Sequence, residues 1–315
     1  MDKIRVVFLA TPDITLKSFE YFINSSEYDV LALVTQKAKA QNRGNKVVER
    51  NITKIAKANN IPVFEPDKIS RDKEIIASLE ALKLDFFITF AFGQILSQEV
   101  IDIPKFATIN LHASLLPELR GANPISAAIA EGKKYTGITT MKTVLELDAG
   151  DICLQEKIEI SPDMNVIELM EIISDLSPML LDKTLKGLYD NTLVPKKQDS
   201  TKATFTKKIK KEEKLIDWNT PAQTLHNKIR AMYKINTNHT VFNGKIIKVL
   251  KTTPLEMSCD AQSGEITDIK KDGIIVKCLD NTLKIITVKP EGKGEMPASA
   301  WANGARIKKG DIFGK

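Results

Sequence analysis

Two polar side chains, Asn110 and His112, stand one residue apart at the end of an apolar run. Alternate residues of an extended strand point to the same face, so we expect both side chains on one side. An amide N–H can stabilise a developing oxyanion, and an imidazole can carry a proton near neutral pH. Asp148, a lone acid in a tight turn further along the chain, can complete an acid–base set. These residues therefore predict a site for proton transfer beside a neutral hydrogen-bond donor.

The elements that must position these residues alternate regularly along the chain. Short apolar runs, typical of buried strands, occupy residues 4–9, 30–35, 86–90 and 108–111. Helix-like segments occupy residues 16–23, 47–59 and 73–82. Strands separated by helices indicate a parallel, doubly wound α/β sheet. Residues 141–144 and 152–158 flank the Asp148 turn as a predicted hairpin, and residues 166–189 have the spacing of one long amphipathic helix.

The composition changes after this long helix. The next segment is polar and weakly periodic, as linkers are, and Thr220-Pro221 then opens a further helix. Beyond it, short apolar segments alternate with turn-forming pairs such as Asn243-Gly244 and Asp272-Gly273, which predicts a small antiparallel β-barrel. The predicted organisation is a first domain at residues 1–190, a linker at residues 191–206 and a second domain at residues 207–315.

Length and composition restrict the class of protein. A chain of 315 residues with 43% hydrophobic and 27% charged residues indicates a globular protein with two domains. No apolar run reaches the roughly 18 residues that a membrane span needs, and no signal-peptide pattern precedes the first strand. Cys153, Cys259 and Cys278 lie too far apart for a disulfide framework or a CxxC metal site. We expect a cytoplasmic protein with reduced thiols and no metal.

Charge is distributed unevenly along the chain. Residues 1–205 carry 25 Lys and Arg against 28 Asp and Glu, a net of −3, whereas residues 206–315 carry 21 against 12, a net of +9. A basic second part is what a module that binds a polyanion requires. A general bias toward lysine in the composition would give the same count, so charge alone leaves both explanations open.

The order of motifs resembles that of the formyltransferases that use 10-formyltetrahydrofolate. The resemblance rests on Asn110-Leu-His-Ala-Ser-Leu-Leu-Pro117, followed by Arg120-Gly121, Pro124-Ile125, Thr136-Gly137 and Leu147-Asp-Ala-Gly-Asp151. It runs nearly end to end, from Thr11-Pro12-Asp13 to Gly310-Asp311. It implies a Rossmann-like, doubly wound formyltransferase domain followed by a small, OB-like antiparallel β-barrel domain.

The resemblance also implies roles for individual residues. Asn110 would donate to the oxyanion, His112 would donate a second hydrogen bond and carry the proton, and Asp148 would orient the imidazole or relay protons. The residues implied to bind the cosubstrate 10-formyltetrahydrofolate are Phe90, Ala91, Phe92, Gly93, Gln94, Ile95, Leu96, Ser114, Leu115, Leu116 and Pro117. Ser114 has no base and acid pattern beside it, so we expect a hydrogen bond within the loop rather than a nucleophile.

The linker, the Asp217-Trp218 pair and the barrel resemble the family members that act on an aminoacylated tRNA. The implied partner is initiator methionyl-tRNA, whose α-amino group would accept the formyl group, and the implied enzyme is a monomer. The resemblance implies that Arg43 contacts this tRNA, and we also expect contacts from Lys46 in the same loop. The basic charge of the second part adds Lys207, Lys208, Lys210 and Lys211 as expected contacts. The chain departs from the family at Ala10, Ile14 and Glu118, and in the turn after Ala231.

Two other functions remain compatible with the sequence. The same chemistry serves enzymes whose acceptor is an amino-sugar nucleotide or a purine precursor, and the basic C-terminal part favours tRNA over these. A non-catalytic RNA-binding protein with a degenerate folate domain is the second alternative. The complete set of Asn110, His112 and Asp148 argues against it.

Overall fold

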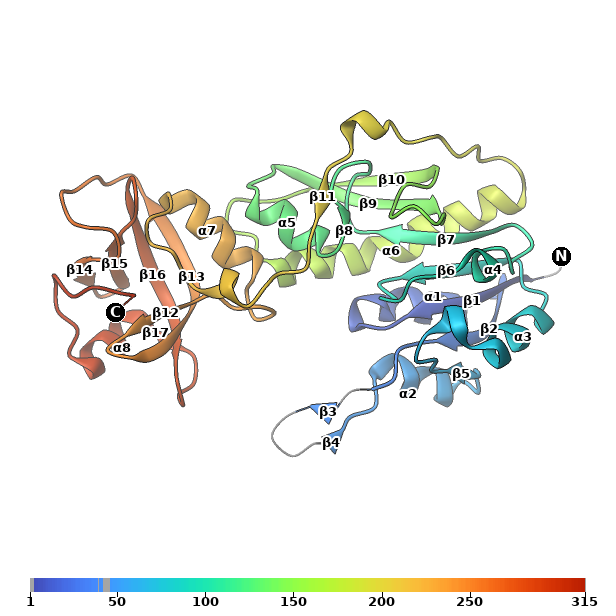
Figure 1. Cartoon of the computed structure of the whole chain (residues 1–315), viewed down its shortest axis with the longest axis horizontal. Coiled ribbons are helices and arrows are strands. Elements are labelled where there is room, and N and C mark those ends of the chain that lie inside the picture. The colour runs from blue at the N-terminus through green and yellow to red at the C-terminus, as the bar shows by residue number, and fades with distance from the viewer. Residues whose placement is uncertain (1–2, 39, 42–45, 315) are drawn as a thin grey trace. The chain divides into compact units, whose positions relative to one another are not determined.

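The structure is a computed structural model that describes residues 3–38, 40–41 and 46–314 (Figure 1). Its contacts divide the chain into two compact units, each built from more than one segment. The N-terminal unit comprises Met1–Gly121, Thr136–Glu159 and Met170–Phe205, and the C-terminal unit comprises Ala122–Tyr135, Ile160–Leu169 and Thr206–Lys315. Among the described residues, no helix is both long enough and apolar enough to span a membrane.

A seven-stranded sheet forms the centre of the N-terminal unit, in the order β10-β9-β7-β6-β1-β2-β5. Its strands are β1 (Ile4–Ala10), β2 (Tyr28–Val34), β5 (Val63–Phe64), β6 (Phe86–Phe90), β7 (Ala107–His112), β9 (Tyr135–Lys142) and β10 (Ile152–Glu159). The neighbouring strands β5, β2, β1, β6 and β7 pair in parallel. Strand β9 pairs antiparallel with β7. The doubly wound α/β fold is therefore confirmed.

Helices cover both faces of this sheet, which explains why its central strands are continuously apolar. The helices of the unit are α1 (Leu16–Asn24), α2 (Asn51–Ala58), α3 (Lys73–Ala81), α4 (Gln98–Ile101) and α6 (Val166–Tyr189), whose first turn belongs to the C-terminal unit. Along β1, Val7 and Leu9 pack in one core with Leu79 of α3. Phe8 points the other way, and its ring meets that of Phe19 in α1 edge-on at 5.2 Å.

Short elements complete the N-terminal unit. They are η1 (Asp13–Thr15), η2 (Ile69–Arg71), η3 (Ser200–Lys202), β3 (Ala40–Gln41), β4 (Lys46–Val47) and β8 (Arg120–Gly121), with β8 paired to β11 (Phe205–Thr206). The helix predicted over residues 47–59 begins only at Asn51, so the prediction was wrong in its first turn. Arg50 is extended there, and its Nε donates to the carbonyl oxygen of Gln36 over 3.0 Å.

The C-terminal unit is built on an antiparallel sheet, in the order β12-β13-β16-β15-β14 with β17 beside β16. Its elements are α5 (Pro124–Ala130), η4 (Glu212–Lys214), α7 (Ala222–Ala231), β12 (His239–Phe242), β13 (Lys245–Leu255), β14 (Ile266–Lys270), β15 (Gly273–Lys277), β16 (Thr282–Pro290), β17 (Met296–Pro297) and α8 (Ala298–Ala305). The predicted small antiparallel β domain is confirmed.

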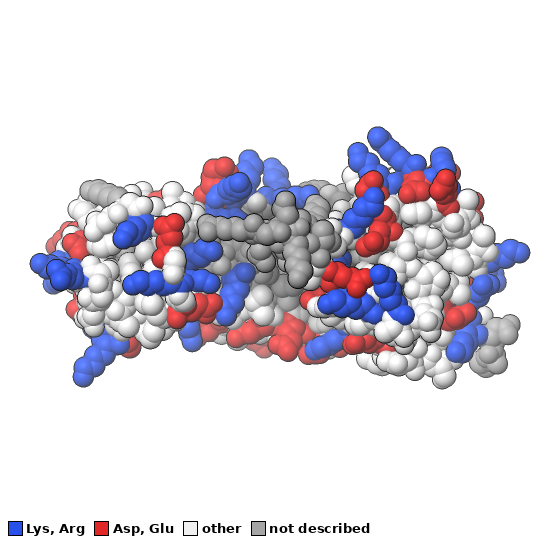
Figure 2. Space-filling view, turned by 90° about the horizontal axis from the view of Figure 1, so that it is seen from below, with Lys and Arg blue, Asp and Glu red and all other residues white. Residues whose placement is uncertain are grey.

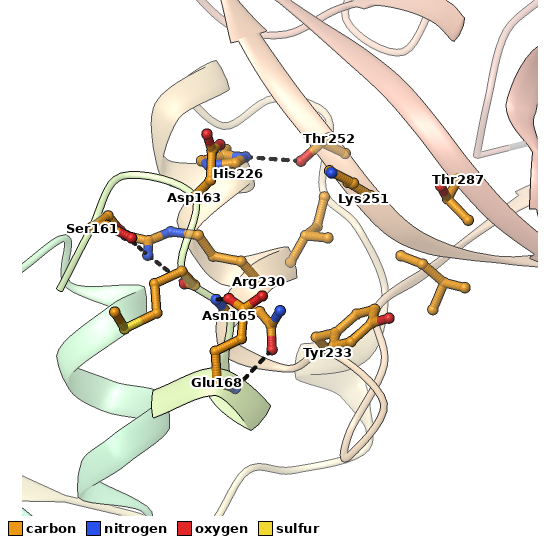
Figure 3. A pocket seen from close by; sticks show the side chains of 13 residues that line it. Ser161, Asp163, Asn165, Glu168, His226, Arg230, Tyr233, Lys251, Thr252 and Thr287 are labelled. Carbon is orange, nitrogen blue, oxygen red and sulfur yellow. Dashed lines mark hydrogen bonds and ion pairs between the residues drawn. The ribbon is translucent and has the colours of Figure 1, made fainter. Parts of the chain in front are cut away.

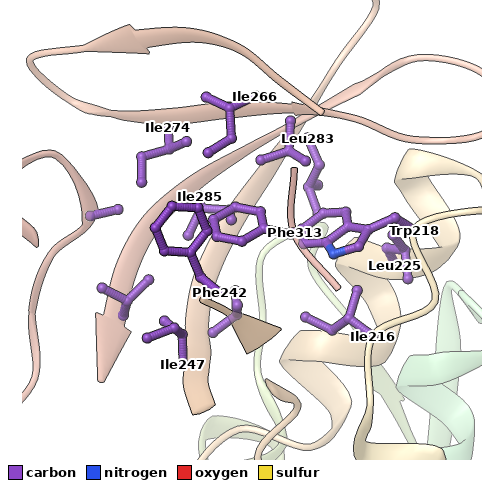
Figure 4. Close-up of a cluster of buried hydrophobic side chains, with 14 of the residues drawn as sticks. Ile216, Trp218, Leu225, Phe242, Ile247, Ile266, Ile274, Leu283, Ile285 and Phe313 are labelled. Carbon is purple, nitrogen blue, oxygen red and sulfur yellow. The ribbon is translucent and has the colours of Figure 1, made fainter. Parts of the chain in front are cut away.

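The last described residues bridge the two edges of this sheet. Phe313 N donates to the carbonyl oxygen of Gly264, just before β14, over 2.9 Å, and Gly314 N donates to Val241 of β12 over 2.8 Å. The ring of Phe313 lies against Trp218 and Phe242 in the apolar core of the unit (Figure 4). Residues 310–314 therefore join β12 to β14 through their backbone while one side chain fills the interior.

Candidate active site

In the N-terminal unit, Asn110, His112 and the predicted folate residues lie at the carboxyl ends of the parallel strands β6 and β7, and Asp148 lies in the connection between β9 and β10. The sheet reverses its strand order at β1, since β2 lies on one side of β1 and β6 on the other. Ligands of open α/β sheets bind outside the carboxyl ends at such a point. Here Thr11 Oγ1, after β1, donates to Phe92 O, after β6, over 3.0 Å. Gln36 Nε2, after β2, donates to the same carbonyl over 2.7 Å.

Asn110 lies in β7 and is oriented by the neighbouring strand. Thr89 of β6 pairs with it in the sheet, and Thr89 Oγ1 donates to Asn110 Oδ1 over 2.8 Å. The same hydroxyl also lies 3.3 Å from Ile109 O, and the shorter bond is the one to the Asn110 amide oxygen. With its oxygen engaged in this way, the Asn110 amide nitrogen keeps both of its protons for another acceptor. Asn110 is thus arranged to donate, as the oxyanion role requires.

His112 ends β7 and is buried, with both ring nitrogens facing oxygen atoms. Its Nε2 lies 2.9 Å from Leu119 O, and since a carbonyl only accepts, Nε2 carries the proton of that bond. Nδ1 lies 3.7 Å from Asp148 Oδ2, beyond hydrogen-bond length but within the range of an ion pair. A neutral His112 therefore turns an unprotonated nitrogen toward Asp148, where it can accept a proton.

Asp148 sits in the left-handed backbone region, with φ of 49°. Its Oδ2 accepts the backbone N–H of Gly121 over 2.7 Å while it faces His112. Close by, Gly150 is required, because a Cβ there would lie 1.7 Å from Lys142 O. The turn therefore holds the carboxylate at the end of β7, and the structure brings the predicted His112 and Asp148 together beside Asn110.

Sequence reasoning missed the residues that support this turn. Gln198, in the segment predicted as a linker, donates from Nε2 to Asp148 O and to Gly150 O, each over 2.8 Å. Thr204 of the same segment accepts the Arg120 backbone N–H over 2.8 Å. Polar residues in a weakly periodic stretch look solvent-exposed, and nothing in the local sequence marks these contacts.

The predicted folate segment after β6 divides into buried and exposed residues. Phe92 and Leu96 are buried in the core beneath the site, whereas Ile95 is 88% exposed. Gly93 has φ of 79°, and a Cβ there would lie 2.4 Å from Gln36 Nε2. Gln94 is tied by its side chain, since Oε1 accepts Ile69 N over 2.8 Å. Of the seven predicted residues, Phe90 thus ends β6, and residues 91–96 form the loop that follows it.

The second predicted folate segment, residues 114–117, follows β7 directly. Ser114 is fully buried, and its Oγ donates to Glu118 O over 2.6 Å. Leu116 N donates to Thr139 Oγ1 of β9 over 3.2 Å. The peptide bond between Leu116 and Pro117 is cis. The Ser114 hydroxyl is thus engaged inside the loop, in agreement with its prediction as a loop hydrogen bond.

The residues predicted to contact tRNA are placed unevenly by the structure. Arg43 lies outside the described residues, and Lys46 lies in the short strand β4. Lys207, Lys208, Lys210 and Lys211 are exposed and form no ion pair with another described residue. Figure 2 shows basic side chains spread over the face it presents, with acidic side chains between them.

A cavity of about 570 Å³ lies elsewhere, within the C-terminal unit (Figure 3). None of the predicted catalytic or folate residues lines it. Two of its buried side chains hold the segment 160–169: Arg230 Nη1 donates to Met164 O over 2.7 Å, and His226 Nε2 lies 3.3 Å from Pro162 O. Because these polar groups already bind backbone oxygens, we assign them a structural role.

The described part of the chain offers no metal centre. It contains no group of three or more His, Cys, Asp and Glu side chains placed to hold an ion. Cys153 and Cys278 are free and buried, and burial raises the pKa of their thiols to about 11 and about 12. These thiols are therefore protonated near neutral pH and unreactive.

Comparisons with known proteins agree with this arrangement. A family model described as formyl transferase matches residues 4–185, and one described as formyl transferase, C-terminal domain, matches residues 208–306. The chain is 38% identical over 311 residues to the methionyl-tRNA formyltransferase of Bacillus licheniformis, covering 98% of each chain. It is 37% identical over 310 residues to that of Clostridium acetobutylicum, covering 98% of this chain and 99% of the relative.

A solved structure has the same fold at lower identity. WlaRD, a sugar 3N-formyl transferase crystallised in the presence of dTDP and 5-N-formyl-THF, superposes with a TM-score of 0.66 at 17% identity. The superposition covers 93% of this chain and 100% of WlaRD, and at this identity it shows a common fold and no more. On the family models and the full-length relatives together, the chain belongs to the formyl transferase family, among relatives named methionyl-tRNA formyltransferase.

Proposed function

We propose that this protein transfers the formyl group of 10-formyltetrahydrofolate to the α-amino group of initiator methionyl-tRNA. The observation that carries the proposal is the meeting of His112 and Asp148, 3.7 Å apart, beside an Asn110 amide whose N–H groups are free to donate. Relatives that cover 98% of the chain under the name methionyl-tRNA formyltransferase support the same acceptor.

In this reaction the amine nitrogen bonds to the formyl carbon, the bond from that carbon to N10 of the folate breaks, and the amine proton ends on N10. The protein's own part is positioning and charge stabilisation. Asn110 donates to the formyl oxygen as negative charge develops there, an interaction worth on the order of 10²–10³ in rate. His112 accepts the amine proton at Nδ1, and the Asp148 carboxylate stabilises the imidazolium that forms.

The folate segments support binding of the cosubstrate beside these groups. Phe90–Leu96 and residues 114–117 follow neighbouring parallel strands, so their backbones lie at the same edge of the sheet as Asn110. Ala91 and Gly93 both have positive φ, so the backbone turns on either side of Phe92, whose carbonyl oxygen is held by Thr11 and Gln36. Such a loop suits a flat ring that is recognised through backbone donors and acceptors.

We assign residues 1–190 to catalysis, residues 191–206 to the connection and residues 207–315 to tRNA binding in a cytoplasmic, monomeric enzyme. The family models, at residues 4–185 and 208–306, support these limits. The exposed Lys207, Lys208, Lys210 and Lys211 support an electrostatic anchor for the RNA backbone. Arg43 is carried over from the family as a contact to the acceptor end.

The direct test is incubation with methionyl-tRNA and 10-formyltetrahydrofolate, followed by mass analysis of the released amino acid. We expect formylmethionine. Parallel reactions with an amino-sugar nucleotide and a purine precursor as acceptors should give no formyl product. A product with either of these and none with methionyl-tRNA would support the alternative acceptor, which the fold of WlaRD leaves open.

The RNA anchor is tested in the full chain, because the C-terminal unit includes Ala122–Tyr135 and Ile160–Leu169 and is not one contiguous fragment. Replacing the four lysines at 207, 208, 210 and 211 by alanine should weaken tRNA binding and reduce its salt dependence. The slope of log affinity against log salt should fall by about 0.7–0.9 for each phosphate contact removed. Folate affinity should not change, and an unchanged salt slope would place the anchor elsewhere.

A further inference from the structure

All hydrogen-bonding groups of the Gln198 amide are engaged. Its Oε1 accepts from Arg120 Nη2 over 2.8 Å and from Arg120 Nε over 3.1 Å. Its Nε2 donates to Asp148 O and Gly150 O, each over 2.8 Å. The two Arg120 donors fix which end of the amide is oxygen, so the nitrogen must face the turn.

Arg120 strengthens this arrangement by its charge. Its side chain is almost completely buried, at 1% exposure, and a buried guanidinium requires acceptors. A hydrogen bond from a charged donor polarises the amide, which makes the Gln198 N–H groups better donors. The positive charge of Arg120 therefore reaches the Asp148 turn through the Gln198 amide, and Arg120 Nη1 also lies 3.5 Å from the exposed Glu146 carboxylate in the same connection.

The turn depends on support of this kind because one residue has to satisfy two contacts at once. Asp148 has a left-handed backbone, and its carboxylate has to reach Gly121 N and face His112 at the same time. The side chain is held by Gly121, whereas the backbone carbonyls on either side of Ala149 are held by Gln198. Loss of Gln198 frees the backbone that aims the carboxylate.

We propose that Gln198 is a positioning residue for formyl transfer: its amide, oriented by Arg120, fixes the Asp148 turn so that the carboxylate faces His112. The inference rests on the proposed function, since it assumes the role of Asp148 in that reaction. It adds a residue from the connecting segment to the frame of the active site.

A purely structural role, that of tying down the segment 191–206, would explain the contacts less well. The backbone of this segment is already fixed on both sides of Gln198. Lys196 and Ile152 exchange two hydrogen bonds of 2.8 Å, and Thr204 O accepts Arg120 N over 2.8 Å. The Gln198 side chain is therefore not needed to hold the segment in place.

The experiment compares Gln198→Ala, Gln198→Glu and the control Val194→Ala in the full chain. Val194 belongs to the same segment, and its side chain is 78% exposed. Glutamate keeps the acceptor for Arg120 but, when ionised, cannot donate to the turn. We expect kcat to fall about 10- to 100-fold in both Gln198 variants, the range expected for a misplaced catalytic group. The KM values for folate and tRNA should stay within about threefold of wild type.

The pH dependence separates positioning from structural support. The activity of Gln198→Glu relative to wild type should rise as the pH falls, because a protonated carboxyl can donate to the turn again. Near-wild-type kcat in Gln198→Glu at neutral pH would overturn the proposal, since only the Arg120 acceptor would then matter. Gln198→Glu also serves if Gln198→Ala does not fold, because it leaves Arg120 satisfied.

A readout without turnover distinguishes failure of this inference from failure of the proposed function. The chain has three histidines, so the imidazole NMR signals can be assigned by substitution of His226 and His239. In both Gln198 variants we expect the His112 signals to shift while those of the other two stay in place, and no change in Val194→Ala. Unchanged His112 signals in the Gln198 variants would overturn the positioning role. If the wild-type protein does not transfer a formyl group, only the proposed function is refuted, because the NMR readout does not depend on turnover.

Discussion

The hydroxyl of Thr89 donates to Oδ1 of Asn110 over 2.8 Å, across the pair of strands β6 and β7. The bond holds the oxygen end of the Asn110 amide toward β6 and leaves the two N–H groups for another acceptor. The orientation of the oxyanion donor is thus set by a buried threonine that takes no part in the chemistry.

Thr89→Val keeps the shape of the side chain and removes this bond, together with the longer contact of the same hydroxyl to Ile109 O at 3.3 Å. We expect kcat to fall by about tenfold, the value of one hydrogen bond, which is less than the 10²–10³ expected on removal of the donor itself in Asn110→Ala. The rate of formyl transfer in each variant is measured in a single-turnover reaction. Thr108→Val is the matched control, since Thr108 Oγ1 is also buried but donates to Ile101 O. An equal loss of kcat in both variants would mean that Thr89→Val acts by lowering the stability of the protein and not by disturbing Asn110.

Asp148→Asn tests the carboxylate without disturbing the turn. Asparagine tolerates the left-handed backbone, and its Oδ1 can still accept Gly121 N, so only the charge toward His112 is lost. We expect kcat to fall by about 10² or more and the pH–rate profile to change. Asp151→Asn, close by in sequence, should have little effect. An unchanged pH–rate profile in Asp148→Asn would mean that Asp148 has only a structural role.

Gly150→Ala should be severely destabilising. The new Cβ would lie 1.7 Å from Lys142 O, which is backbone of β9 and cannot move aside. We expect a loss of more than about 3 kcal/mol in the free energy of unfolding, measured by denaturant titration. Gly304→Ala in α8 is the opposite case, because nothing lies within 4 Å of its Cβ position. Alanine should stabilise that helix by about 0.5–1 kcal/mol.

His226 makes the stability of the protein depend on pH. Burial is the main cause that lowers its pKa below the ordinary 6.5, with Arg230 acting in the same direction and the Pro162 carbonyl and Asp163 opposing. Below about pH 6.5 the unfolded chain therefore takes up a proton that the folded chain does not, so stability is complete above this pH and falls with acidification. The slope from one such group cannot exceed about 1.4 kcal/mol per pH unit.

His226→Gln should remove this part of the pH dependence. We expect the difference in unfolding free energy between wild type and variant to shrink steadily from pH 7.5 to pH 5.5, measured by denaturant unfolding at each pH. His239, whose pKa is also lowered by burial, is present in both proteins and cancels in the difference. A difference that is the same at every pH would mean that His226 does not titrate differently in the folded state.

Much of the fold and part of the site follow from local patterns. The alternation of a strand places Asn110 and His112 on one face, and the apolar run 86–90 and the helical spacing of residues 166–189 give β6 and α6 with their observed limits. The sequence pattern predicts a strand at residues 141–144, whereas β9 spans Tyr135–Lys142 and includes the polar residues Thr139 and Thr140. Their hydroxyls are bonded inside the fold, to Ser114 O and to Thr184 Oγ1.

The rest of the site depends on contacts that no local pattern encodes. Gln198 reaches Asp148 across 50 positions and Arg120 across 78, and Thr89 meets Asn110 across 21. The loop after β7 places Leu119 O beside His112 Nε2, and this contact sets the tautomer of the imidazole. Apart from Leu119, which contributes its backbone carbonyl, these residues are polar, and only the folded chain shows which polar residues are buried with a partner.

The bridge that residues 310–314 make between β12 and β14 has a practical consequence for handling this protein. A chain shortened before Gly310 would leave the N–H and C=O groups of two strands without partners, and it would uncover the core that Phe313 fills. Unpaired strand edges beside exposed apolar surface are templates for pairing between molecules. Residues 310–314 thus guard against self-association, and truncations that remove them should be expected to yield aggregated protein.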